Sequence, residues 1–128
     1  MKIQLSGILG LSLFFVTTCD EPKEQDTIPP EITITFPQNG SLVFEIITIT
    51  CISSDNEGVK KVELWVDNST NGIIDATEPY SLEWNTTYYE DDIYSIFVRS
   101  YDNNGNTTDS DPISLIVDNS DSYPSPVV

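Results

Sequence analysis

Residues 67–78 carry oxygen side chains at the spacing of a calcium-binding loop. That pattern asks for oxygen ligands at positions 1, 3, 5, 9 and 12 and for glycine at position 6, which is Gly72 here. Ca²⁺ prefers hard oxygen ligands, and a final glutamate can bind it through both carboxylate oxygens. The candidate side-chain ligands are Asp67, Ser69, Asn71, Asp75 and Glu78, and Ile73 would offer its carbonyl oxygen. Ser69 is a weaker, neutral ligand where Asp or Asn is expected.

Acidic side chains also gather in two other turns. One turn contains Asp55, Asn56 and Glu57, and the other contains Asp102, Asn103 and Asn104. In a β-sandwich of the predicted topology, both turns lie at the same end of the domain, near Asp26 of the segment that enters it. A metal site is one interpretation of each acidic segment. The alternative is a plain polar connection, because Asp and Asn also favour turns by bonding to their own backbone.

The composition excludes several other kinds of chemistry. The chain has no histidine, so catalytic triads and histidine-based zinc sites are ruled out. With 21 acidic and 5 basic residues, its net charge is −16, which argues against binding to nucleic acid or to anionic lipid headgroups. Nothing in the sequence places two carboxylates across a cleft, as glycoside hydrolysis requires. We therefore expect no enzyme activity.

The strands that position these residues are predicted from side chains that alternate with a period of two. Apolar and polar side chains alternate from residue 31 to residue 117, and Asn, Asp and Gly separate the runs. Strands with one apolar face must bury that face against a second sheet, so we predict an all-β, seven-stranded antiparallel sandwich. The inward sets are Ile32, Ile34 and Phe36; Ile47, Ile49 and Cys51; Val62, Leu64 and Val66; Tyr80, Leu82 and Trp84; Tyr94, Ile96 and Val98; and Ile113, Leu115 and Val117.

Three of the inward residues have specific expected roles. Cys51 falls on the apolar side of its run, which indicates a small buried hydrophobe rather than a reactive thiol. Trp84 is the better candidate for the central core aromatic, because Trp65 has outward parity. Tyr94 lies two residues before the inward Ile96, where a tyrosine hydroxyl can pin the preceding loop.

One outward face of the predicted sandwich is rich in aromatic residues. On the sheet built from the third, sixth and seventh strands, Trp65, Phe97, Tyr101 and Ile116 share outward parity. Neighbouring strands lie about 5 Å apart, so these side chains can form one patch, with Lys61, Glu63 and Arg99 at its rim. The patch is either a docking surface for a sugar or protein, or cross-strand packing that stabilises a small domain.

The amino terminus has the features of an export signal. Residues 1–18 contain one lysine and an apolar run from 8 to 16, which is shorter than the roughly 20 residues of a permanent anchor. Cys19 comes directly after this segment, and the chain then becomes polar. This arrangement resembles the signal of bacterial lipoproteins, in which the cysteine becomes the first mature residue and carries acyl chains. The alternative is an ordinary cleaved secretory signal.

The expected organisation is therefore a signal peptide (1–18), an acidic tether (19–30), the β-sandwich (31–117) and a linker-like tail (118–128). The lipoprotein resemblance implies attachment to the membrane through an N-terminal lipid on Cys19. It also implies a place in the bacterial cell envelope, on the outer membrane or cell surface or at the periplasmic face.

Four segments of the predicted sandwich resemble bacterial Ig-like domains, which are related to cadherin and fibronectin III domains. They are residues 30–40, 55–67, 79–86 and 101–106, and the likeness extends over about 29–118. It implies a noncatalytic module for surface display, spacing or adhesion. Cadherin-like domains also place calcium at one end of the sandwich. The alternatives are a calcium-dependent module that binds an extracellular protein or polysaccharide, and an accessory domain of a larger secreted enzyme system.

Overall fold

The computed structural model describes residues 24–120, so the expected signal segment, Cys19 and residues 121–128 lie outside the described part. The described residues form nine strands and one short 3₁₀ helix, η2 (Thr86–Tyr88). The strands are β1 (Glu31–Phe36), β2 (Leu42–Val43), β3 (Ile46–Ser54), β4 (Val59–Val66), β5 (Ser69–Asp75), β6 (Tyr80–Asn85), β7 (Asp92–Asp102), β8 (Thr107–Asp109) and β9 (Ile113–Val117). No helix in residues 24–120 is long and apolar enough to cross a membrane.

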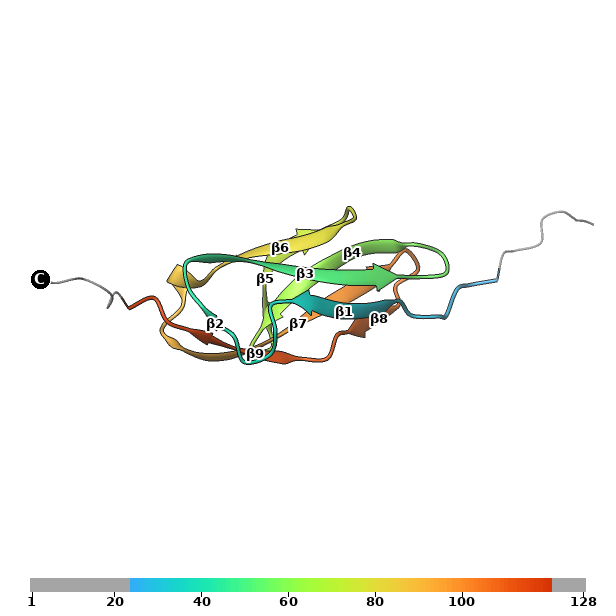
Figure 1. Ribbon diagram of the computed structural model, residues 1–128. Coiled ribbons are helices and arrows are strands. Elements are labelled where there is room, and N and C mark those ends of the chain that lie inside the picture. Colours follow the sequence, from blue (N-terminus) through green and yellow to red (C-terminus); the bar gives the residue numbers. More distant parts are fainter. Residues whose placement is uncertain (1–23, 121–128) are drawn as a thin grey trace, which may run out of the picture.

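The strands form two sheets that pack face to face (Figure 1). The smaller sheet has the order β1-β3-β6, and the larger has the order β2-β9-β7-β4-β5, with β8 added beside β7. All the pairs are antiparallel except the short parallel pair of β2 and β9. This confirms the predicted Ig-like antiparallel sandwich. The short strands β2 and β8 are added to the seven longer ones.

The core consists of the alternating residues that face the opposite sheet. Five of the six predicted inward sets point into it, and Ile49, Leu64, Trp84, Ile96 and Leu115 are fully buried. Each of these residues belongs to a different strand, so every long strand except β1 and β5 contributes a fully buried side chain. The inward alternation is therefore confirmed for those strands.

The prediction for Phe36 is wrong. Ile32 and Ile34 of β1 pack against the core, but the Phe36 side chain is 56% exposed. The pairing of β1 with β3 shifts register between Ile34 and Phe36. A bulge of this kind inserts one residue into the strand and moves the following side chains to the other face.

An aromatic cluster closes the end of the core where β7 begins. Trp84 is fully buried, and the rings of Tyr89 and Tyr94 meet it edge to face with centroids 5.1 and 6.0 Å away. The Tyr94 hydroxyl donates a 2.7 Å hydrogen bond to the carbonyl oxygen of Glu90. The expected roles of Trp84 in the core and of Tyr94 in fixing the preceding loop are thus confirmed.

The sandwich is elongated, and its described ends lie at opposite ends of the long axis (Figure 1). The segment before β1 joins the end that contains the β3–β4 turn, and the chain after β9 leaves from the other end. The two acidic turns and Asp26 therefore lie where the chain enters the domain.

Substitution of Leu64 by alanine tests the core directly. Leu64 is fully buried, so Leu64→Ala removes apolar contacts and leaves a cavity, which should lower the free energy of unfolding by about 2–5 kcal/mol. Leu42, on the surface strand β2, is 58% exposed, and the matched Leu42→Ala should change this free energy by less than about 1 kcal/mol. Urea denaturation measures both. Equal losses would contradict the assignment of Leu64 to the core.

Candidate functional site

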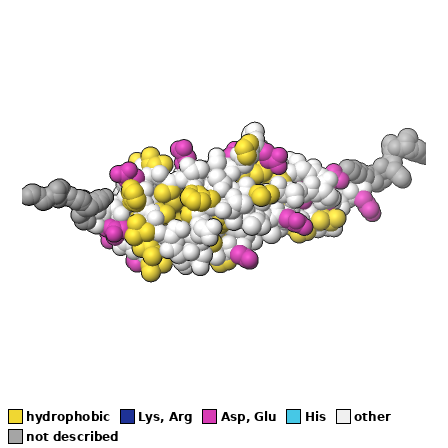
Figure 2. All heavy atoms as spheres, in the orientation of Figure 1, with side chains coloured by type: hydrophobic (Ala, Val, Ile, Leu, Met, Phe, Trp, Pro, Cys, Tyr) yellow, Lys and Arg dark blue, Asp and Glu magenta, His cyan; other side chains and the backbone are white. Residues whose placement is uncertain are grey.

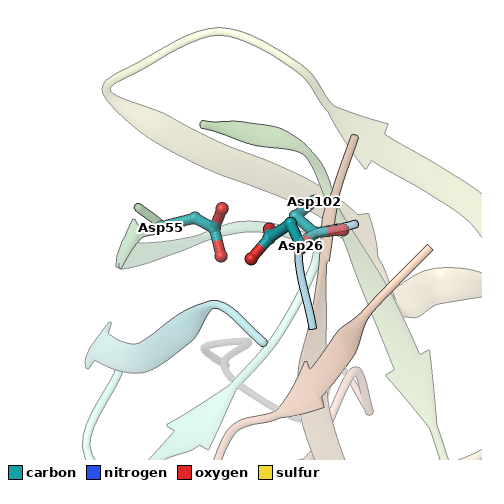
Figure 3. A group of neighbouring side chains, drawn as sticks. All are labelled: Asp26, Asp55 and Asp102. Atoms are coloured by element: carbon teal, nitrogen blue, oxygen red, sulfur yellow. The ribbon is translucent and has the colours of Figure 1, made fainter. Parts of the chain in front are cut away.

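Three aspartates from distant parts of the chain meet at the end where the N-terminal segment joins the sandwich. Asp26 lies in that segment, Asp55 in the β3–β4 turn and Asp102 at the end of β7. Each offers a carboxylate oxygen, and these oxygens all lie within 4.8 Å of one another (Figure 3). The sequence-based expectation that the two acidic turns approach Asp26 is confirmed. We call Asp26, Asp55 and Asp102 the aspartate cluster.

Hydrogen bonds hold one oxygen of Asp26 and one of Asp55. Asp26 Oδ1 accepts from the backbone N–H of Ile28 and from Asn56 Nδ2, each at 3.1 Å. Asp55 Oδ2 accepts from the backbone N–H of Glu57 at 2.8 Å. The other oxygens, Asp26 Oδ2 and Asp55 Oδ1, are buried and have no hydrogen-bond partner. Burial of such an atom is unfavourable unless something pairs with it.

Asp102 is the most buried member of the cluster, with 1% of its surface exposed. Its Oδ1 accepts from the backbone N–H groups of Asn104 and Asn106, and its Oδ2 accepts from Asn106 Nδ2 at 2.8 Å. Burial raises the pKa of Asp102, but these hydrogen bonds outweigh it and hold the pKa below the ordinary value. Asp102 therefore carries a negative charge at neutral pH. The Asn106 amide also donates to the Asp26 carbonyl oxygen, which ties the N-terminal segment to the domain.

The segment 67–78 does not have the structure of the expected calcium loop. Asp67 and Asn68, both with positive φ, form a two-residue turn, and β5 then runs back along β4 from Ser69 to Asp75. An extended strand rises about 3.3 Å per residue, so β5 spreads its side chains over roughly 20 Å. Ligands of one ion lie within about 5 Å of one another. The structure therefore does not bring Asp67, Ser69, Asn71, Ile73, Asp75 and Glu78 around a single point.

Several of these residues instead bond to neighbouring strands. Asp67 Oδ1 accepts from the backbone N–H of Ser95, and Asp75 Oδ2 accepts from that of Ser81. Asn71 Nδ2 donates to the Tyr89 hydroxyl at 3.2 Å. These contacts fasten the β4–β5 hairpin to the rest of the sandwich.

The outward aromatic residues form a ladder of three cross-strand pairs between β4 and β7. The pairs are Lys61 with Tyr101, Glu63 with Arg99, and Trp65 with Phe97. The rings of the last pair stack with centroids 5.7 Å apart, and the Arg99 guanidinium lies 4.4 Å from the centre of the Trp65 ring. All six side chains are partly buried. This is the geometry of cross-strand packing, the second interpretation of the patch.

Glu63 connects the polar groups of this ladder. Its carboxylate accepts hydrogen bonds from Tyr101, Thr70 and the Trp65 indole N–H. Burial raises the pKa of Glu63, but these hydrogen bonds, together with the charge of Lys61, hold it below the ordinary value. Arg99 forms an ion pair with Asp109 of β8, with Nε and Oδ1 2.6 Å apart. The ladder thus satisfies its own polar groups.

Ile116 does not join the aromatic ladder. It lies on β9 opposite Ile93 of β7, with Leu42 of β2 on its other side. Trp65, Phe97 and Tyr101 come together as predicted, whereas Ile116 belongs to a separate row of exposed apolar side chains.

The sequence analysis missed an apolar hollow beside β2. Figure 2 shows hydrophobic side chains gathered at that part of the surface. The hollow is lined by Phe36, Leu42, Phe44 and Ile46, each of which is about half exposed or more. Period-two alternation could not identify this hollow. Strand β2 has only two residues, and the bulge in β1 turns the Phe36 side chain from the core to the surface.

Cys51 is buried in the core, as predicted. Burial, with a smaller effect of the Asp75 charge, raises the pKa of its thiol to about 11. A thiol with this pKa is protonated at neutral pH and is a poor nucleophile.

Comparison with known proteins agrees with the observed fold. Residues 30–98 match the sequence model of a family described as "Bacterial Ig domain". No curated protein matches the chain.

Two solved structures share the fold at low sequence identity. The fibronectin(III)-like modules of Clostridium thermocellum CbhA have a TM-score of 0.65 and 23% identity, over 79% of this chain and 53% of theirs. The endo-beta-1,4-mannanase from Thermotoga petrophila has a TM-score of 0.59 and 19% identity, over 74% of this chain and 21% of its own. The chain thus corresponds to about half of the first structure and about a fifth of the second.

Glu63 gives the aromatic ladder a measurable pH dependence. Because folding lowers its pKa, ionised Glu63 contributes stability above its ordinary pKa of 4.5, and this contribution is lost as the pH falls through the lower folded-state value. Glu63→Gln should reduce the free energy of unfolding by about 1 kcal/mol at pH 7, and the difference from wild type should shrink below pH 4.5.

Glu83→Gln is the matched control, since Glu83 is exposed on β6. Urea denaturation between pH 7 and pH 3 compares the two variants. Parallel pH profiles for both would contradict a special role for Glu63.

Proposed function

This chain belongs to the bacterial Ig domain family, and on that premise we propose that it is a noncatalytic protein of the bacterial cell envelope. Its Ig-like domain serves in display, spacing or adhesion. A lipid on Cys19 attaches it to the membrane. Acidic residues far outnumber basic ones in the chain, and the resulting acidic surface keeps the displayed domain soluble.

The placement of the described ends is the observation that carries this proposal. The N-terminal segment joins one end of the elongated sandwich and the chain leaves β9 at the other end (Figure 1). A domain connected in this way adds its full length to the distance between the tether and the C-terminal tail. Two tightly packed sheets resist bending, so the domain holds that distance better than a flexible linker of the same number of residues would.

The chemistry of the described residues also favours a noncatalytic role. Cys51 is buried with a raised thiol pKa, and the aspartates of the cluster are held by backbone and amide hydrogen bonds. The polar groups of the aromatic ladder bond to one another rather than pointing into a cleft.

An accessory domain of a secreted enzyme system is the second candidate function. Its support is the fold shared with the CbhA modules and with part of the T. petrophila mannanase. The alignment covers 21% of the mannanase chain, so the likeness concerns only one part of that protein. In this alternative the domain would occupy the same place in a larger assembly and would still lack catalytic groups of its own.

Mass spectrometry of the mature protein from a bacterial membrane fraction tests the anchoring part of the proposal. We expect the chain to begin at Cys19 and to carry the added mass of acyl chains. Cys19→Ser should abolish this modification and release the protein from the membrane fraction, while Cys51→Ser, at a buried position in β3, should leave both unchanged.

Two results would contradict lipid anchoring. One is an intact Met1 on protein recovered from the cytoplasm, and the other is a mature chain that begins at or near Cys19 without acyl groups.

A further inference from the structure

We propose that the part of the sandwich where the chain leaves β9 binds a basic, aliphatic-rich segment of another protein. The inference rests on the adhesion role proposed for this domain and names the chemistry of its partner, but it does not depend on the lipid anchor. The binding surface combines the exposed apolar row on β7, β9 and β2 with the hollow beside β2. We call this surface the apolar patch, and its residues are Phe36, Leu42, Phe44, Ile46, Ile93 and Ile116.

The apolar patch is continuous across two neighbouring features of the surface. Leu42 of β2 pairs with Ile116 of β9, and Ile116 pairs with Ile93 of β7, so three exposed aliphatic side chains form one cross-strand row. Leu42 also lines the hollow, which joins the hollow to the row. The hollow has a volume of about 410 Å³. Ligand pockets have volumes of about 300–1,000 Å³, so the hollow can accept side chains of a partner.

The exposure of the patch distinguishes it from the aromatic ladder on the same sheet. The ladder side chains stack on one another and are partly buried. The patch side chains are between 38% exposed, at Ile116, and 61% exposed, at Ile93. Single exposed apolar residues are ordinary in a soluble domain, whereas a contiguous group marks a contact surface. Covering the patch would remove apolar surface from water and stabilise a complex.

Carboxylates border the apolar patch. Glu45 lies in the segment that lines the hollow, Asp92 directly precedes Ile93 of the row, and Asp118 directly follows β9. All three acidic residues are exposed. Hydrogen bonds from Ser120 lower the pKa of Asp118, so its carboxylate is ionised at neutral pH. A partner that covers the patch therefore meets negative charge at its border.

The basic side chains of residues 24–120 lie away from the patch. Lys60 and Lys61 belong to the start of β4, at the end of the sandwich where the N-terminal segment enters. Arg99 lies on the same strand as Ile93 but roughly 20 Å further along it, and it forms an ion pair with Asp109. A second copy that used the same patch would bring carboxylates against carboxylates, and such a dimer would be repelled. The partner must therefore supply the positive charge.

The patch and its border together specify the class of partner. Anionic lipid headgroups would be repelled by the carboxylates, and a neutral polysaccharide would leave them without counter-charges. A protein segment with aliphatic side chains between Lys or Arg residues satisfies both requirements. The patch also lies away from the N-terminal segment (Figure 1), so a domain tethered through that segment would present it outward.

Nuclear magnetic resonance titration of the isotope-labelled full chain tests the proposal. The probe is a short synthetic peptide of alternating leucine and lysine. We expect it to shift the backbone amide signals of the patch residues, and we expect its affinity to fall as salt is added, because ions screen the carboxylates. Two control peptides, one of leucine and glutamate and one of serine and lysine, should bind about tenfold or more weakly.

Variants of exposed residues locate the binding surface. The double variant Leu42→Ser, Ile116→Thr should weaken binding of the leucine–lysine peptide by about tenfold or more, because it removes apolar contacts from the row. Ile52→Thr is the matched control, because Ile52 is 65% exposed on β3 of the other sheet, and it should bind like the wild type. Glu45→Gln and Asp92→Asn should weaken binding mainly at low salt.

Circular dichroism and urea denaturation show whether each variant is folded. If the double variant does not fold, the signals that shift in the wild-type chain decide where the peptide binds. Shifts confined to the patch would support the proposal, and shifts that lie elsewhere would contradict it.

Four other results would overturn the proposal. The serine–lysine peptide could bind as tightly as the leucine–lysine peptide, which would indicate general attraction to an acidic protein. Equal binding of the leucine–glutamate peptide would contradict the role of charge. Equal weakening by Ile52→Thr would contradict the location. Sedimentation that shows a wild-type dimer, lost in the double variant, would mean that a second copy covers the patch.

These results are separate from the test of anchoring. Peptide binding is measured on the purified chain, whereas the lipid on Cys19 is detected in the membrane fraction. Failure of the peptide to bind would remove the partner proposed here and leave the anchoring result unchanged, and a chain without acyl groups would leave the peptide result unchanged.

Discussion

Each sheet of this protein has one apolar face, and only the other sheet can shield that face from water. Fully buried side chains such as Leu64, Trp84 and Leu115 fill the space between them. This packing fixes the direction of every long strand and, with it, the places where the turns begin and end. The cross-strand ladder, the tyrosine hydrogen bond and the aspartate cluster all depend on a backbone that the core has already positioned.

The outward side chains of the larger sheet do not contact the core, and on β4 and β7 they pack against one another across the strands. The ladder of β4 and β7 combines aromatic stacking, two cations over rings and a carboxylate with several donors. Such contacts add stability to a small domain, in which the ratio of surface to core is high. At the end of the sandwich the same framework brings the three carboxylates of the aspartate cluster together, an arrangement that is unfavourable by itself because like charges repel.

The period of two predicted the strands because side chains of a strand alternate between its two faces, whatever the rest of the chain does. It failed where local geometry departs from that rule. The bulge in β1 reversed Phe36, and the match of residues 67–78 to a loop pattern hid an edge strand. Asp67 and Asn68 did carry a turn signal, since both residue types tolerate positive φ. The calcium-loop pattern instead placed both residues at the start of a metal-binding loop.

The sequence by itself determined most of the strands and which of their faces are buried, because those properties depend on residues a few positions apart. It also identified the two acidic turns and the outward parity of the aromatic residues. It did not determine β5 or the side on which Phe36 lies. Only the tertiary structure decided that Asp26, Asp55 and Asp102 meet with two buried oxygens left unpaired, and that Ile116 is separate from Trp65 and Phe97. These outcomes depend on strand order and register between distant segments, which local alternation does not encode.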